Sequence, residues 1–114
     1  MNAIAYAMPE LERIPHRFLD LLNERKMHVA QYALAAWDGE TVENVNQNLE
    51  AARSILQEVS GSAGTVDYPQ LGITAQQCEA QIIAHLEGDY ADLAICPGEI
   101  VWFVDRFVEA CDAI

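Results

Sequence analysis

The spacing of the apolar residues between positions 42 and 63 constrains the fold more than any other feature of this sequence. Apolar residues recur there at alternating steps of three and four, which places them on one face of an α-helix, as in a helix packed into a bundle. No segment shows the sustained alternation of β-branched residues that predicts a strand. The apolar stripe consists of Val42, Val45, Leu49, Ala52, Leu56, Val59 and Ala63.

Four long helices are predicted in all. The striped segment is expected to be helical from about 39–41 to 64, and the same periodicity predicts helices over 15–37, from 68 or 69 to 86, and from about 97 onward. The apolar faces of these three are Phe18, Leu22, Val29, Ala33 and Ala36, then Leu71, Ala75, Cys78, Ile82 and Leu86, then Ile100, Val101, Val104, Phe107, Val108 and Cys111.

Proline and glycine residues set the expected boundaries of the first helix. Pro15 suits a first helical position and should separate its helix from a short one over 8–14. Gly39 is expected to cap the C-terminal end of the 15–37 helix in the left-handed conformation. The sequence therefore predicts an all-α fold, an antiparallel up-down four-helix bundle with a short N-terminal helix, in one domain spanning 1–114. Core and helix-end packing is expected for Trp37, Trp102 and Phe103.

Charge narrows the classes of partner. The formal net charge is −12, and residues 40–114 hold two basic against thirteen acidic side chains. Nucleic acid and anionic membrane surfaces are excluded as partners, because both attract the opposite sign. No apolar run reaches the ~20 residues of a membrane-spanning helix, and no signal peptide is recognisable. We therefore expect a cytoplasmic protein whose partner is another protein or a small molecule.

The sequence predicts neither a metal site nor a catalytic centre. The cysteines at 78, 96 and 111 form no CxxC pair, and we expect reduced thiols with at least two in the core. No Glu-x-x-His motif of a di-iron bundle occurs. Acid–base catalysis needs a perturbed pair in a cleft, which a small bundle hardly offers. We expect no enzyme activity, no metal and no cofactor.

The segment 57–65 carries the functional signal. It places glycines and serines inside a helical pattern, although an interior glycine costs about 1 kcal/mol relative to alanine. On a helix these small residues share one side with the exposed amide of position 57, away from the core stripe. Small neighbours let a partner's backbone approach closely. The predicted partner-binding residues are Arg53, Ser54, Gln57, Ser60, Gly61 and Gly64.

This segment resembles the motif of the histidine-containing phosphotransfer (HPt) family. The run Gly61-Ser62-Ala63-Gly64-Thr65 matches the second half of the motif, Val59 matches its hydrophobic position, and Tyr68-Pro69-Gln70-Leu71 resembles the turn that follows. The resemblance implies a two-component phosphorelay protein. In that family an exposed histidine exchanges a phosphoryl group with a receiver-domain aspartate, so the implied partners are a response-regulator receiver domain, a sensor histidine kinase, or both.

The chain departs from the family at the phosphoacceptor position, which is Gln57. An amide nitrogen is not a useful nucleophile, whereas imidazole has a free lone pair near neutral pH. The predicted phosphoryl transfer is therefore disabled while the docking surface stays, with Arg53 as the one cation a turn away. His16, His28 and His85 lack the small neighbours that would open them to a partner.

An alternative reading remains open. The chain would then be a helical protein-interaction domain unrelated to phosphorelay, in which Gly61 and Gly64 serve only close helix packing.

Overall fold

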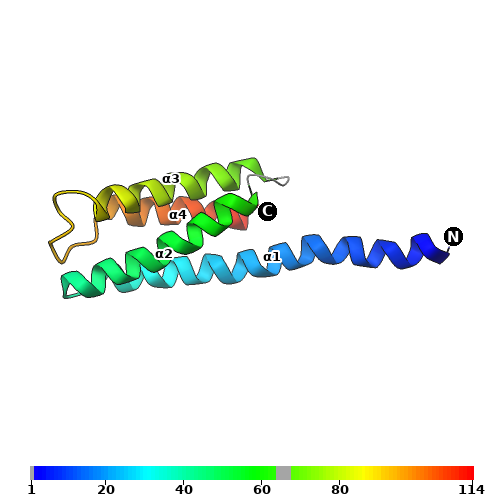
Figure 1. The fold of residues 1–114 in the computed structure, drawn as a ribbon, viewed down its shortest axis with the longest axis horizontal. Helices are drawn as coiled ribbons and strands as arrows, with labels where there is room; N and C mark the ends of the chain where they lie inside the picture. Colours follow the sequence, from blue (N-terminus) through cyan, green and yellow to red (C-terminus); the bar gives the residue numbers. More distant parts are fainter. Residues whose placement is uncertain (1, 64–67) are drawn as a thin grey trace.

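The computed structural model describes the backbone of residues 2–63 and 68–114, and the side chains of 18–62 and 68–114. Within these ranges the secondary structure is helical and contains no strand (Figure 1). The predicted all-α four-helix bundle is confirmed. Its helices are α1 Asn2–Trp37, α2 Val42–Ala63, α3 Pro69–Leu86 and α4 Gly98–Asp112.

The helices close into a ring of neighbours. Each packs against the next along the chain, and α4 packs back against α1. Across the described residues the backbones of the diagonal pairs α1–α3 and α2–α4 lie further apart than those of neighbouring helices, so the core lies between all four. The molecule measures 63 × 21 × 19 Å. The long dimension comes from α1, whose N-terminal part extends past the other helices (Figure 1).

The expected break at Pro15 is wrong. No separate short helix precedes the bundle, because α1 runs without interruption from Asn2 to Trp37 and includes both Pro9 and Pro15. A proline inside a helix removes one backbone hydrogen bond, but its fixed φ is helical. The residues between the two prolines include strong helix formers, and helix growth is cooperative once begun. Proline therefore weakens α1 locally without ending it.

The predicted stripe of α2 forms the centre of the core except at its start, where Val42 is partly buried and lies outside the core cluster. Val45, Leu49, Ala52 and Leu56 are completely buried, and Val59 is 1% exposed. The predicted faces of the other helices are buried or pack at the core's margin, and the side chain of Ala63 lies outside the described residues. The remaining buried apolar residues are Leu22, Val29, Ala33, Ala36, Leu71, Ala75, Cys78, Ile82, Cys96, Ile100, Val104 and Phe107.

Local contacts fix where helices begin and end. The Thr41 hydroxyl accepts a hydrogen bond from the Asn44 amide at 3.1 Å, which caps the start of α2. Gly39 does not adopt the expected left-handed conformation, because no described glycine has a positive φ. Instead, this position needs a residue without a side chain, since a Cβ there would lie 2.8 Å from the Val45 side chain. Gly39 thus allows the α1–α2 turn to pack closely against the core.

The two ends of the bundle are closed by different means. At one end Phe18 of α1 stacks on Tyr68, which precedes α3, with ring centroids 5.3 Å apart. At the other end the connector 87–97 is held to α2, because the Asn46 side-chain amide donates to the carbonyl of Ala91 at 2.9 Å. None of the helices in the described ranges is long and apolar enough to cross a membrane.

Candidate functional site

Gln57 lies on the outer side of α2, as the sequence predicted. Its neighbours on the inner side, Leu56 and Val59, belong to the core, while Gln57 itself is exposed. Its side-chain amide makes no hydrogen bond within the described part of the chain, and its backbone carbonyl accepts one from the Ser60 hydroxyl at 3.0 Å. The side chain is therefore free to contact a partner.

Gly61 leaves open space one turn beyond Gln57. A Cβ added there would meet no atom of the described residues within 4 Å. Packing against the described residues therefore does not explain Gly61, and Gly64, the other glycine of the packing alternative, lies outside the described residues. Since an exposed helical glycine costs about 1 kcal/mol relative to alanine, the presence of Gly61 favours a role outside the folded chain.

The structure brings together five of the six predicted site residues on one side of α2. Ser54 and Gly61 are exposed like Gln57, and Arg53 and Ser60 are partly buried. Gly64 lies outside the described residues. We call the surface formed by Arg53, Ser54, Gln57, Ser60 and Gly61 the Gln57 surface.

Arg53 is less available than the sequence suggested. Its Nε donates to Glu50 Oε1 at 2.7 Å, its Nη2 contacts the same oxygen, and its Nη1 lies 4.0 Å from Glu79 of α3. The hydrogen bond to Glu50 raises the pKa of the Arg53 guanidinium above its ordinary value. The charge of Arg53 is therefore already matched by carboxylates of this chain.

A second ion pair borders the Gln57 surface on its α1 side. Arg25 Nη2 lies 3.5 Å from Oε2 of Glu58, the residue next to Gln57. Sequence reasoning missed both Arg25 and Glu79, because each comes from another helix and reaches α2 only through tertiary packing. Around the Gln57 surface two arginines thus face three carboxylates, Glu50, Glu58 and Glu79, so both positive charges are matched and one negative charge is in excess.

The polar groups of the Gln57 surface are the Gln57 carboxamide, the Ser54 and Ser60 hydroxyls and the paired Arg53 guanidinium. The described residues contain no cluster of His, Cys, Asp and Glu that could hold a metal ion. His85 is half-buried on α3, and burial lowers its pKa. His28 is exposed, and the side chain of His16 lies outside the described residues.

The three cysteines are free thiols. Cys78 and Cys96 are buried, which confirms the prediction of at least two in the core, and Cys111 is partly buried. Burial raises the pKa of the Cys78 and Cys111 thiols to about 12, and that of Cys96 above its ordinary value. Since the thiolate is the reactive form, these thiols are protected by the fold.

We expect slow alkylation of the native protein by iodoacetamide. At pH 8 a thiol with a pKa near 12 is ionised to roughly one part in ten thousand. Labelling counted by mass spectrometry should stay low in buffer, rise with pH, and reach all three cysteines in denaturant. Rapid labelling of Cys78 in the native state would contradict this packing.

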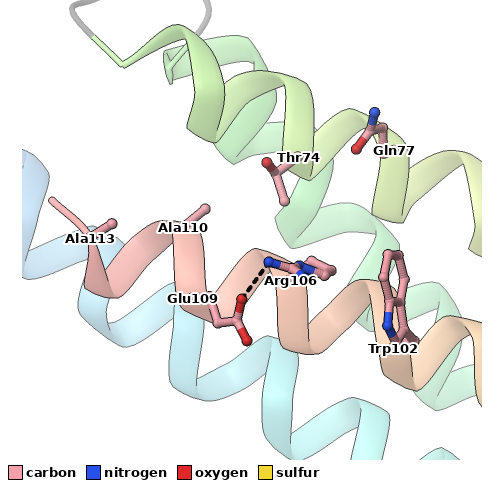
Figure 2. Close-up of a pocket in the computed structure, with 7 residues that line it drawn as sticks. All are labelled: Thr74, Gln77, Trp102, Arg106, Glu109, Ala110 and Ala113. Atoms are coloured by element: carbon pink, nitrogen blue, oxygen red, sulfur yellow. Dashed lines mark ion pairs between the residues drawn. The ribbon is translucent and has the colours of Figure 1, made fainter.

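A second polar surface lies between α3 and α4. A hollow of about 480 Å³ is bordered there by Trp102 and Arg106. Figure 2 shows Arg106 between Glu109 and Trp102, with Thr74 and Gln77 of α3 opposite. The guanidinium pairs with Glu109 at 2.7 Å and sits 5.5 Å from the Trp102 ring centroid. Its charge is therefore already balanced within α4.

Two expected packing roles for tryptophan are wrong. Trp37 and Trp102 are each 55% exposed, whereas Phe103 packs against the core and meets Trp102 edge to face at 4.9 Å. Both indoles point outward because the inward positions of α1 and α4 are occupied by the core residues of those helices.

Comparison with known proteins finds no match: no family model, no curated protein and no solved structure corresponds to this chain. The functional argument therefore rests on the motif and on the geometry of the Gln57 surface.

Proposed function

We propose that this chain is a histidine-phosphotransfer-like protein of a two-component phosphorelay, which docks a response-regulator receiver domain or a sensor histidine kinase without carrying phosphate. The observation that carries the proposal is the exposed Gln57 beside Gly61, whose missing side chain leaves open space. The resemblance of residues 59–71 to the HPt motif gives this surface its proposed partners.

The local charge balance supports docking to a receiver domain. A receiver presents an acidic pocket, which a net charge of −12 would repel over a distance. Arg53 and Arg25 pair with the carboxylates that border the Gln57 surface. The acidic pocket would therefore meet a face whose carboxylates are partly balanced by two arginines, while the unpaired acidic residues elsewhere disfavour other orientations.

The chemistry of Gln57 separates docking from transfer. Its amide nitrogen is delocalised into the carbonyl and does not attack an acyl phosphate, which a histidine does through its free ring nitrogen. A bound copy would occupy the receiver's surface and exclude a competent phosphodonor. The proposed role is therefore that of a competitor or scaffold in the relay.

Replacing Gly61 with tryptophan is expected to weaken receiver binding about 30-fold or more, because a large ring in the open space would hold the partner away from Gln57. Binding is measured by calorimetry with purified receiver domains encoded in the same genome. Thermal unfolding should stay unchanged, since a Cβ at position 61 would meet no other atom of the described residues within 4 Å.

Gln47→Trp is the matched control. Gln47 is exposed on α2, fourteen residues before Gly61 and so about 21 Å along the same helix. It should leave binding intact. Retained binding by the Gly61 variant contradicts the docking surface, and failure of every receiver and kinase to bind the unmodified protein favours the unrelated interaction domain.

A further inference from the structure

A second, apolar groove lies between α1 and α4, on a different pair of helices from the Gln57 surface. It encloses about 390 Å³. Leu34 and Trp37 of α1 form one wall and are 61% and 55% exposed. Val101, Val104 and Asp105 of α4 form the other wall. Large apolar side chains gathered in one exposed groove mark an interaction site more often than a chance surface.

The apolar wall on α1 continues as a stripe. Met27, Ala30, Leu34 and Trp37 follow one another at steps of three, four and three, and Met27 is 51% exposed. This stripe is separate from the core face of α1. It spans about 15 Å, which matches roughly three turns of a partner helix. Such spacing suits an amphipathic helix laid into the groove.

Charge decides which partner fits. In the part of the chain with described side chains, every lysine and arginine is already in an ion pair. Asp105, on the groove wall, has no ion-pair or hydrogen-bond partner among those residues, and neither has Asp38 just beyond Trp37. A second copy would bring another surface of net charge −12 with no unpaired cation from its described residues. A partner must therefore supply positive charge.

We propose that the α1–α4 groove binds an amphipathic helix of another protein whose apolar face is flanked by lysine or arginine. Its apolar side chains fill the space between Leu34 and Val101, and its basic side chains pair with Asp105 on the groove wall and with Asp38, the residue after Trp37. The site does not depend on the proposed phosphorelay function, because it uses neither α2 nor Gln57.

The test uses a synthetic helical peptide of about four turns, with leucines spaced three and four apart and lysines on both sides of the leucine face. Calorimetry should show saturable one-to-one binding. Leu34→Ser should weaken it at least tenfold and Asp105→Asn severalfold, with the unfolding temperature unchanged because both residues are exposed. Trp102→Ser is the control, because it removes a large apolar side chain with an exposure similar to that of Leu34 from the α3–α4 hollow. It should have no effect on peptide binding.

Two control peptides separate the groove from general attraction to an acidic protein. A version with glutamate in place of lysine should not bind, and a scrambled version of the lysine peptide should bind weakly and without dependence on Leu34. The proposal is overturned if the scrambled peptide binds equally, if the lysine peptide does not bind, or if sedimentation shows a dimer that Leu34→Ser dissociates. The last result would make the groove an interface between two copies.

Discussion

Truncating Phe107 to alanine is expected to lower the free energy of unfolding by about 3–5 kcal/mol. Phe107 is fully buried and the largest such side chain in the core. Its removal forfeits the transfer of the ring from water and leaves a cavity that four packed helices refill only in part. A domain of this size has a total stability of about 5–15 kcal/mol, so the loss brings the bundle close to unfolding.

Urea denaturation followed by circular dichroism measures this effect. Trp102→Ala is the matched control, since it deletes an aromatic ring from the same helix at a site that is 55% exposed. It should cost less than about 1 kcal/mol. The dependence of the free energy on urea should not change in either variant if both unfold in one step. Equal losses for Phe107 and Trp102 would contradict the placement of the core.

The core could be predicted from the sequence because a helix imposes its own period. The steps of three and four from Val45 to Val59 admit one inward face, and that face is buried. The predicted ends of α2 were within three residues of Val42 and Ala63, since Thr41 and Gly39 mark the turn. Local patterns of this kind need no knowledge of the other helices.

Two features of α1 and the turn after it could not be predicted, the continuation of the helix through Pro15 and the role of Gly39, because in each case another effect outweighs the local sequence signal. Pro15 carries a signal for a helix start, but cooperative helix growth on both sides outweighs the one lost hydrogen bond, and α1 continues. Gly39 was expected to supply a left-handed cap, whereas its role is to leave room beside Val45. That requirement arises from tertiary contact and leaves no trace in sequence spacing.

In the candidate site, the exposure of the side chains could be predicted from the sequence, but the ion pairs between helices could not. The exposure of Gln57 and Gly61 follows from their angular position relative to the stripe on α2, and the structure confirms it. The pairing of Arg53 with Glu79 joins two helices, and so does that of Arg25 with Glu58. Which charges meet across helices depends on register and crossing geometry, which periodicity does not fix.

Changing Gln57 to histidine is expected to give the protein a phosphoryl-accepting group. The side chain at 57 is exposed and its amide has no hydrogen-bond partner among the described residues, so an imidazole there can reach a partner without disturbing the core. Incubation with a radiolabelled, phosphorylated receiver domain should label this variant and not the unmodified protein. The label should be lost in acid and kept in base, as for a phosphoramidate.

We expect Arg53 to control the rate of phosphoryl uptake by the histidine variant. Because Glu50 and Glu79 hold its guanidinium, little positive charge is free to stabilise the arriving phosphoryl group. Adding Glu50→Gln to the histidine variant should release Arg53 and raise the labelling rate, whereas adding Glu43→Gln, which changes an exposed carboxylate at the far end of α2, should not. If the histidine variant takes up no label while Gly61 still controls receiver binding, the lost chemistry extends beyond residue 57. If neither behaves as expected, this helix surface has no place in a phosphorelay.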